Sequence, residues 1–345
     1  MVHGSGHVSL SSSDPSRCAY YNPAMPARVV RPRRPLSWFA ERLTERLLFE
    51  PRRAEAAFVR RLRADMPALE GGSAADAASL WDHLRAEIRR LVRTKDPERF
   101  LQWPPVRASI VRRSRARVAA ELRHLRGRAD WAARWRPALR EMTLGAPRPF
   151  SLMPSSSGTL IHQAYHLCRF EEATGRPVDR ERLVVEFGGG YGAMCWVMHR
   201  LGFRGTYVIV DLPEVSALQR FYLRHTGLEV VDADNGLPAH GVVTTSDLGR
   251  LTSLLGERPP GAAAFLAAWA LSESPVSLRD RVRASVADFD DFLIGYTERC
   301  LDVDNRAYFA DWRARLPDRR WYDVPVPQLR EADWHLFGTR DAGAV

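Results

Sequence analysis

The sequence has no hydrophobic run long enough to cross a membrane. A transmembrane helix needs about 18 consecutive apolar residues, whereas the longest uninterrupted apolar run, residues 262–271, has ten. The first thirty residues also lack the apolar block of a signal peptide. We therefore expect a protein without a membrane span, located in the cytoplasm.

Cysteine is scarce and scattered. The four cysteines among 345 residues are Cys18, Cys168, Cys195 and Cys300, and no two of them form a Cys-x-x-Cys pair. This pattern argues against a disulfide framework and fits a reducing compartment. Because an Asp-x-Asp-x-Asp ladder is missing as well, we expect no metal centre.

Lysine is almost absent, since Lys95 is the single lysine and arginine supplies the other positive side chains. Residues 1–150 contain 30 Lys and Arg against 15 Asp and Glu, a balance of +15. Residues 151–345 contain 21 against 26, a balance of −5, so the two halves sum to +10. A basic arm on an acidic body can bind nucleic acid. We favour the simpler interpretation of a solvated arginine-rich surface, and we expect no nucleic-acid partner.

The first half of the chain is predicted to be helical. Residues 1–35 are rich in Ser, Pro and Arg, which is typical of a flexible leader. Residues 36–145 form an Arg-rich helical domain, with helices at about 52–64, 74–93, 105–127 and 129–142 separated by proline and glycine. No strand-like alternation occurs before residue 180. We place the domain boundary between residues 145 and 146.

The second half, residues 146–345, alternates strands with helices. A helix at 157–174 precedes strands at about 183–187, 206–211, 228–231, 241–245 and 289–296, with an apolar run at 262–270 among them. Two closing strands, 321–326 and 333–339, have only a short connection, which requires an antiparallel pair. The predicted fold class is α/β: a doubly wound, mostly parallel, seven-stranded sheet with an antiparallel closing hairpin, preceded by an all-α domain.

A glycine-rich loop follows the first of these strands. Gly188, Gly189, Gly190 and Gly192 come shortly after Glu186 and lead into a helix. This spacing fits both a dinucleotide site and an S-adenosylmethionine site. A dinucleotide places an anionic pyrophosphate at the helix N-terminus, whereas S-adenosylmethionine brings an ammonium and a sulfonium. The carboxylate of Glu186 favours the cationic ligand.

The second strand ends at Asp211, where a carboxylate can accept both ribose hydroxyls of an adenosyl group. NAD would use this residue equally well, so Asp211 supports an adenosine ligand without choosing between the two cofactors. Leu212 follows it directly, and Thr245 and Asp247 follow a later strand. We expect these residues, together with Trp269, to complete the cofactor site.

Three segments together resemble a family of sugar O-methyltransferases. They are Val184-Val-Glu-Phe-Gly-Gly-Gly-Tyr-Gly192, Tyr207-Val-Ile-Val-Asp-Leu-Pro213 and Trp269-Ala-Leu-Ser-Glu-Ser-Pro275, with similar text at 304–308 and 334–340. Enzymes of this family depend on S-adenosylmethionine and are associated with bacterial glycans and natural-product sugars. The resemblance covers about residues 156–340 and implies a class I, Rossmann-like methyltransferase whose cofactor is S-adenosyl-L-methionine and whose acceptor is a sugar hydroxyl.

Methyl transfer to a hydroxyl needs alignment with the methyl donor and a base that removes the hydroxyl proton. The loop that follows residue 270 faces the reacting centre in a doubly wound sheet. Glu273 in this loop is a candidate base, or a helix cap, and Ser272 is a candidate substrate ligand. Enzymes that methylate amino groups of nucleic-acid bases commonly carry Asn/Asp-Pro-Pro-Tyr/Phe here. The Ser-Glu-Ser-Pro sequence counts against that reaction.

Further candidates share one face of the helix at 157–174. His162 and His166 are candidate bases, and Tyr165 between them is a candidate substrate-binding residue. Such residues more often serve in packing, so both interpretations stay open. Tyr191, within the glycine loop, is another candidate substrate-binding residue.

We therefore interpret the chain as an S-adenosylmethionine-dependent O-methyltransferase that acts on a small-molecule or glycan sugar. A second interpretation is an RNA-directed methyltransferase whose basic helical half binds phosphates, and a third is a non-enzymatic scaffold. The sequence leaves the oligomeric state open, including a homo-oligomer.

Overall fold

The computed structural model describes residues 48–50, 52–68, 80–111, 114–258, 261–300, 302–326 and 332–340. The predicted leader at 1–35 lies outside these ranges. Within them, every helix is too short or too polar to cross a bilayer. Cys168 and Cys195 are free and buried.

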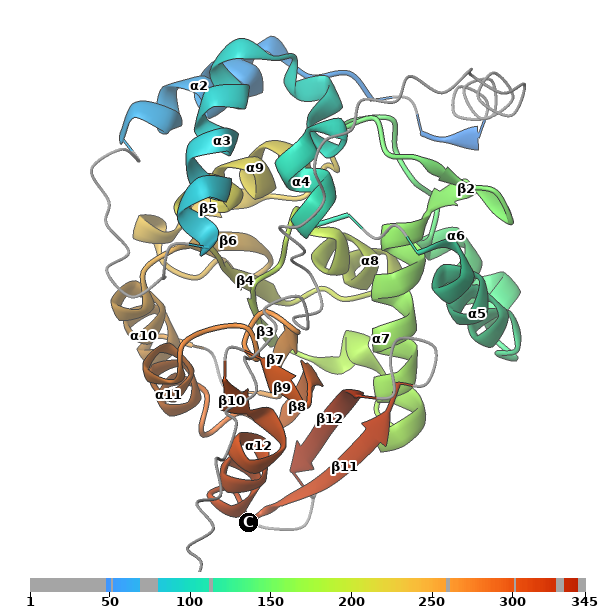
Figure 1. Ribbon diagram of the computed structural model, residues 1–345, viewed down its shortest axis with the longest axis vertical. Helices are drawn as coiled ribbons and strands as arrows, with labels where there is room; N and C mark the ends of the chain where they lie inside the picture. Colours follow the sequence, from blue (N-terminus) through green and yellow to red (C-terminus); the bar gives the residue numbers. More distant parts are fainter. Residues whose placement is uncertain are drawn as a thin grey trace, which may run out of the picture.

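An eight-stranded mixed sheet forms the centre of the molecule (Figure 1). Its strands are β3 (Leu183–Phe187), β4 (Thr206–Val210), β5 (Val230–Asp232), β6 (Gly241–Thr245), β7 (Ala263–Ala268), β8 (Asp291–Thr297), β11 (Arg319–Pro325) and β12 (Asp333–Arg340). The order is β11-β12-β8-β7-β3-β4-β6-β5, parallel from β8 to β5 and antiparallel at β12 and β11. The predicted fold class is confirmed. The strand number is eight rather than seven.

Side chains alternate between the two faces of this sheet, as the two-residue period of a strand requires. In β3, Val184 belongs to one apolar cluster, and Leu183 and Val185 belong to another. In β4, Tyr207 and Ile209 join the cluster of Val184. Both faces are therefore buried, which explains the near-continuous apolar sequence of these strands.

Helices cover both faces. One face packs against α7 (Gly158–Thr174), α8 (Ala193–Leu201) and α9 (Pro213–Arg224). The other packs against α10 (Leu248–Gly256), α11 (Val276–Ser285) and α12 (Asn305–Ala314). Ser157 caps α7 by accepting a hydrogen bond from the backbone N–H of Leu160 at 3.2 Å. Because β3, β4, β6 and β7 are parallel, the loops that follow them share one edge of the sheet.

The region before residue 145 is helical but more broken than the sequence predicts. It contains α2 (Ala56–Ala68), α3 (Leu80–Thr94), η2 (Pro97–Gln102), α4 (Pro104–Ser109), α5 (Arg115–Arg126), η3 (Trp131–Trp135) and α6 (Arg136–Ala138). The helix expected at 105–127 is divided into α4 and α5, and the backbone is extended at Ser114, the N-cap of α5. The helix expected at 129–142 is reduced to η3 and α6, and Pro137, which lacks an N–H group, lies in α6.

The helical region and the sheet share one hydrophobic cluster. Phe100 of η2 lies edge-on to Tyr191 of the glycine loop and to Tyr222 of α9, at 6.1 Å between ring centroids in both pairs. The connection to α7 is a short antiparallel hairpin of β1 (Pro149–Phe150) and β2 (Met153–Ser157), which the sequence did not predict. Smaller elements are η4 (Val178–Arg180), η5 (Ala233–Asn235), β9 (Arg299–Cys300) and β10 (Val303–Asp304).

A buried ion pair fastens α3 to α9, which lie side by side in Figure 1. Glu214, near the start of α9, is fully buried and accepts hydrogen bonds from Arg85 Nε at 2.9 Å and from Arg89 Nη1. The side chain of Arg85 is itself only 6% exposed. Since a buried carboxylate deprived of its cations is costly, this pair determines how α3 lies against the α/β part.

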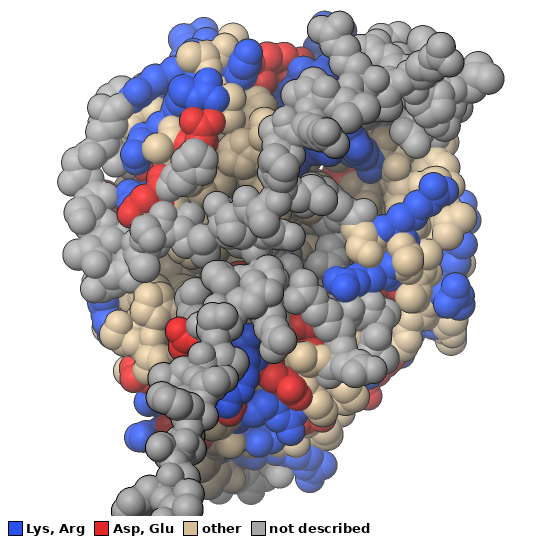
Figure 2. All heavy atoms as spheres, viewed as in Figure 1, with Lys and Arg blue, Asp and Glu red and all other residues tan. Residues whose placement is uncertain are grey.

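Other arginines also pair across the two halves of the chain. Arg134 contacts Glu171 of α7 at 2.6 Å, and Arg128 contacts Glu172 at 3.5 Å. On the visible face of the molecule, positive and negative side chains are mixed (Figure 2). Part of the +15 balance of residues 1–150 is thus matched by carboxylates of the acidic half.

Replacing Glu214 by alanine should loosen α3 from α9. The change leaves Arg85 and Arg89 without their carboxylate, and breaking a buried ion pair costs about 3 kcal/mol or more. We expect the free energy of unfolding, measured by urea denaturation, to fall by that order. Asp311→Ala, which removes a half-exposed carboxylate paired with Arg315 and Arg283, is the control and should leave the midpoint nearly unchanged. Equal midpoints for both variants would contradict the anchoring role of Glu214.

Candidate active site

A cavity of about 570 Å³ lies at the carboxyl ends of β3, β4, β6 and β7. The strand order reverses at β3, which has β4 on one side and β7 on the other. Doubly wound sheets bind their ligands at such a switch point. The glycine loop after β3 and the loop after β7 line the cavity, and α3 and the end of α4 add a wall from the helical region.

The glycine loop borders the cavity with its backbone. Gly188, Gly190 and Gly192 have φ values of 76°, 57° and 92°, a region that residues with a Cβ rarely adopt. A Cβ added at Gly188 would lie 2.1 Å from the Cβ of Ala270 in the loop after β7. Glycine is therefore required at Gly188 both by the backbone conformation and by the close approach of the two loops.

Glu186, at the end of β3, lies beside the glycine loop. It is 3% exposed, and its Oε2 accepts a hydrogen bond from the Tyr207 hydroxyl at 2.9 Å. Burial is the main cause that raises the pKa of Glu186 to about 8. The Tyr207 hydrogen bond lowers this pKa, and the charge of Asp211 raises it. A cation placed in the cavity would favour the ionised carboxylate again, whereas an anion would not. The electrostatics at Glu186 thus favour a cationic ligand.

Asp211 follows β4 and is tied to the same loop. Its Oδ2 accepts hydrogen bonds from the backbone N–H of Gly190 at 3.1 Å and from Gln219 Nε2 at 2.9 Å. Its Oδ1 accepts one from the N–H of Leu212 at 2.8 Å. Burial raises the pKa of Asp211 to about 7, and these three bonds oppose the rise. A carboxylate offers about four acceptor positions, so the contacts hold Asp211 in place and leave room for a ligand hydroxyl.

The structure brings together most of the cofactor residues expected from the sequence. Those that line the cavity are Glu186, Gly188, Gly189, Gly190, Asp211, Leu212 and Asp247. Gly192 lies just behind, as the N-cap of α8. Thr245 does not line the cavity, because its hydroxyl accepts the backbone N–H of Asp247 at 3.2 Å. Asp247 also caps α10, accepting the N–H of Gly249 at 2.7 Å.

The loop after β7 supplies Glu273, Ser274 and Pro275 to the cavity wall. Ser272 faces away from the cavity, and its hydroxyl donates to the backbone carbonyl of Trp269 at 2.8 Å. Tyr191 also lines the cavity, although it is 2% exposed. Of the residues predicted to act on the acceptor, Glu273 and Tyr191 therefore adjoin the cavity and Ser272 does not.

Two sets of lining residues were missed by the sequence analysis. Trp81 and Ile110 reach the cavity from α3 and from the end of α4. Thr159 and Gln163 reach it from α7, four residues apart on one helix face. The four-residue spacing of these two polar residues indicates a polar face on the helix. The interpretation from sequence placed the candidate residues on the adjacent histidine face instead.

His162, Tyr165 and His166 do not line the cavity. All three are buried in the core between α5, α7 and β12. His162 Nδ1 lies 2.7 Å from Glu121 Oε1, and the two Nε2 atoms of His162 and His166 lie 3.0 Å apart. The structure thus separates these residues from the space that an acceptor would occupy.

Trp269 is also buried, at the start of the loop that carries Glu273. Its φ is 68°, unusual for a residue with a side chain. The backbone N–H of Trp269 donates to the backbone carbonyl of Gly295 at 2.9 Å. A Cβ added at Gly295 would come within 2.7 Å of the Trp269 ring. Trp269 therefore shapes the floor beneath the loop.

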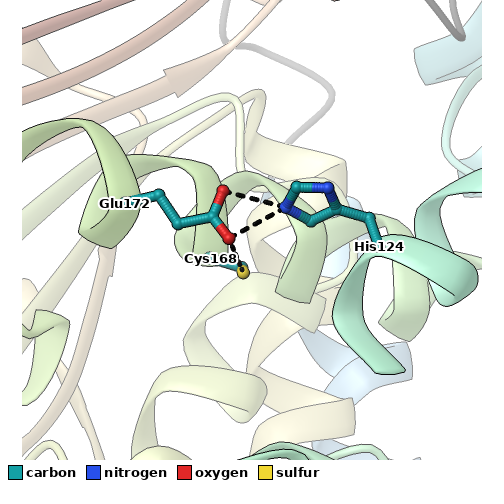
Figure 3. Close-up of side chains that lie close together, drawn as sticks. All are labelled: His124, Cys168 and Glu172. Atoms are coloured by element: carbon teal, nitrogen blue, oxygen red, sulfur yellow. Dashed lines mark hydrogen bonds and ion pairs between the residues drawn. The ribbon is translucent and has the colours of Figure 1, made fainter. Parts of the chain in front are cut away.

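A cluster of metal-ligating residue types lies outside the cavity, between α5 and α7 (Figure 3). His124 Nε2 lies 2.8 Å from Glu172 Oε2, and the Cys168 thiol lies 3.6 Å from Glu172 Oε1. Arg128 and Arg169 contact the same carboxylate at 3.5 and 3.4 Å, and burial raises the pKa of the Cys168 thiol. The two guanidinium groups already neutralise Glu172 and would repel a divalent cation. This cluster acts as an ion-pair network that fastens α5 to α7.

No family model matches the chain, and no match was found among curated proteins.

Solved structures similar to the chain include several methyltransferases. The mitomycin 7-O-methyltransferase MmcR is 15% identical with a TM-score of 0.34, over 83% of this chain and 95% of that one. The magnesium protoporphyrin IX methyltransferase from Synechocystis PCC 6803, solved with bound SAM, is 12% identical with a TM-score of 0.36, over 52% and 80%. The Methanococcus jannaschii fibrillarin pre-rRNA processing protein is 10% identical with a TM-score of 0.34, over 48% and 69%. Such distant likeness says nothing of activity, and the fold assignment rests on the strand order of the chain itself.

Replacing Gly188 by alanine should close the cavity at its tightest point. The new Cβ meets the Cβ of Ala270, and the alanine must adopt a left-handed backbone conformation. Together these two effects lower the free energy of unfolding by about 2–4 kcal/mol. We expect a lower melting temperature and loss of ligand binding. Gly256→Ala is the matched control, because nothing lies within 4 Å of its added Cβ. A Gly188→Ala protein as stable as this control would refute the close approach of the two loops.

Proposed function

We propose that the chain is an S-adenosylmethionine-dependent O-methyltransferase that methylates a sugar hydroxyl of a glycosylated metabolite or glycan. The observation that carries the proposal is the meeting of Glu186, the glycine loop and Asp211 in one cavity at the ends of β3 and β4. The resemblance of three sequence segments to sugar O-methyltransferases supports the choice of acceptor.

The donor set fits S-adenosylmethionine better than a dinucleotide. Two carboxylates with raised pKa values, the buried Glu186 and the half-buried Asp211, line the cavity. A pyrophosphate would add negative charge beside them, whereas the ammonium and sulfonium groups would compensate their charge. Glu186 and the glycine loop would hold the methionine part, and Asp211 with Leu212 and Asp247 would hold the adenosine part.

The remaining wall suits a hydroxylated acceptor. Ser109, Thr159, Gln163 and Glu273 supply polar groups, and Trp81 supplies an aromatic ring. Among the described residues, Gln163 Oε1 is buried without a hydrogen-bond partner, so an acceptor hydroxyl could donate to it. An apolar pocket with a few placed polar groups fixes the orientation of a ligand in this way.

S-adenosylmethionine would supply an activated methyl group. The chain itself must bind the donor and the acceptor, align them and remove one proton from the acceptor. Transfer of this methyl group to a hydroxyl would form an oxygen–methyl bond while the sulfur–methyl bond breaks and leaves a neutral thioether, and the hydroxyl proton would leave the oxygen. Glu273 lines the cavity beside Ala270 and Ser274 and is the proposed acceptor of this proton. Alignment by the cavity walls supplies the rest of the rate enhancement.

Calorimetric titration with S-adenosylmethionine and with NAD tests the cofactor. Glu186 is protonated at pH 7 when its pKa is about 8, and pairing with an ammonium lowers that pKa. Binding should therefore release nearly one proton from Glu186 at pH 7, and this residue alone makes affinity fall about tenfold per pH unit below 8. Glu186→Gln should remove the Glu186 share of the proton release, leave only the share of Asp211, and weaken binding by about tenfold or more.

The same titration separates the alternatives. Measurements in two buffers of different ionisation enthalpy give the number of protons released, and Glu229→Gln, an exposed carboxylate away from the cavity, is the control. Tight binding of NAD with no binding of S-adenosylmethionine would refute the proposed cofactor.

Methyl transfer to candidate glycosides tests the proposed base. Glu273→Gln keeps the size of the side chain but cannot accept a proton, so kcat should fall by about 100-fold or more. Affinity for S-adenosylmethionine should change little, because Glu273 is assigned to the acceptor side. Mass spectrometry of metabolites from a deletion strain, searched for compounds lighter by one methylene, identifies the acceptor. Methylation of RNA with a steep salt dependence would favour the RNA-directed alternative instead.

A further inference from the structure

A chain of four buried polar side chains crosses the core beneath the cavity. It runs from Glu121 of α5 through His162 and His166 of α7 to His335 of β12. The contacts are 2.7 Å from Glu121 Oε1 to His162 Nδ1, 3.0 Å between the two Nε2 atoms of His162 and His166, and 2.9 Å from His166 Nδ1 to His335 Nε2. None of the four residues is more than 1% exposed. The sequence analysis missed Glu121 and His335, which lie far from α7 along the chain.

When Glu121 is ionised and the histidines are neutral, the hydrogen bonds determine which ring nitrogen of each histidine carries the proton. We call this arrangement the proton order. A carboxylate only accepts, so His162 must donate from Nδ1 and accept at Nε2. His166 then donates from Nε2 and accepts at Nδ1, and His335 donates from Nε2. The chain ends at His335 Nδ1, which has no hydrogen-bond partner within the described part of the chain. Each ring thus has a defined tautomer.

The geometry is that of a line rather than of a metal site. His162 and His166 have the four-residue spacing of a helical ligand pair, but His166 uses both ring nitrogens to join its two neighbours. The nitrogens therefore do not converge on one point. Burial lowers the pKa of His335 well below its usual value, and the charge of Arg169 lowers it further.

Trp269 packs against all three rings. Its ring centroid lies 6.2, 5.2 and 5.8 Å from those of His162, His166 and His335. The backbone carbonyl of Trp269 accepts the N–H of Glu273 at 3.1 Å. A displacement of the Trp269 indole would therefore move the backbone carbonyl to which the N–H of Glu273 is hydrogen-bonded.

We propose that Glu121, His162, His166 and His335 form a proton-ordered chain of positioning residues, which holds Trp269 in its left-handed conformation and thereby sets the position of Glu273 in the cavity. The role given to Glu273 rests on the proposed function, whereas the row of four hydrogen-bonded side chains and the histidine tautomers do not. The proposal assigns to the two histidines a supporting role in place of direct proton removal from the acceptor.

The groups that face His335 support a neutral ring there. Arg169 of α7 donates to the Tyr165 hydroxyl at 3.0 Å, and Tyr165 lies 6.3 Å from His335 between ring centroids. Phe337 of β12 covers the other side of His335 at 5.1 Å. The Glu121 carboxylate is hydrogen-bonded to His162, at the opposite end of these four side chains from Arg169. This arrangement favours a negative charge at Glu121 and disfavours a positive charge at His335.

Nitrogen-15 NMR of the histidine rings in the full-length, ligand-free protein tests the proton order. We expect Nδ1–H at His162 and Nε2–H at His166 and His335, each assigned by substitution. His335 should stay neutral near pH 6.5, where exposed imidazoles titrate. A different set of tautomers, or titration of His335 near pH 6.5, would overturn the proposal.

Two substitutions of His335 test the action on Trp269. The amide of Gln can donate to His166 Nδ1 in place of His335 Nε2, whereas Leu cannot donate. We expect His335→Leu to shift the Trp269 indole resonance, assigned with Trp269→Phe, and His335→Gln to restore it. In both variants the dissociation constant of S-adenosylmethionine should stay within about twofold of that of the parent protein.

The outcomes separate the two proposals. An indole resonance that is the same in His335→Leu and in the parent would overturn the positioning role, even if S-adenosylmethionine binds. Absence of S-adenosylmethionine binding by the parent protein would refute the proposed function and leave the tautomers and the indole shift as valid tests. Far-ultraviolet circular dichroism confirms that each variant is folded.

Discussion

The buried pairing of Glu214 with Arg85 and Arg89 is the contact on which the cavity depends. A doubly wound sheet leaves the carboxyl ends of its strands open, and here α3 and α4 supply the missing wall. Trp81 and Leu84 of that wall lie on the same helix as the two arginines. Glu214 is the second residue of α9, which follows the Asp211-Leu212 end of β4. The anchor of α3 and the adenosine side of the cavity are thus adjacent in sequence, so the wall cannot move far without disturbing the cofactor residues.

This anchoring changes the meaning of the charge asymmetry. The basic first half and the acidic second half are matched in part by contacts between them, such as Arg134 with Glu171. Arginine suits these contacts because its planar guanidinium can bind a carboxylate with two parallel hydrogen bonds. Arg134 does so, with Nη1 and Nη2 at 2.7 and 2.6 Å from the two oxygens of Glu171. A chain that uses arginine for internal pairing has less positive charge available for phosphates than its composition indicates.

Much of the sheet and of the cofactor side could be predicted, because the signals are local. Strand periodicity and glycine spacing are read over a few residues, and Glu186, Gly188 and Asp211 lie where the strand ends require them. The acceptor wall could not be predicted in the same way. Trp81 and Ile110 reach the cavity only because distant helices pack on α9 and on the glycine loop, and apolar periodicity does not identify the partner of a helix. The break between α4 and α5 was missed for a similar reason: it allows Ile110 to approach Gly190, where an added Cβ would lie 2.9 Å from its side chain.

Helix α7 shows most clearly what a sequence pattern leaves undetermined. Residues three or four apart share a face, so the pattern groups Thr159 with Gln163 and His162 with His166, on neighbouring faces about 60° apart. It does not say which face meets solvent, a ligand or the core. The structure directs the Thr159 face to the cavity and the histidine face to the core, where polar groups need partners. Those partners come from α5 and β12, elements that no local pattern connects to α7. A buried histidine whose two nitrogens both bond to protein groups has a fixed tautomer and little freedom to exchange a proton with a ligand. The same contacts that remove His162 and His166 from direct catalysis therefore make them suitable for holding Trp269 in place.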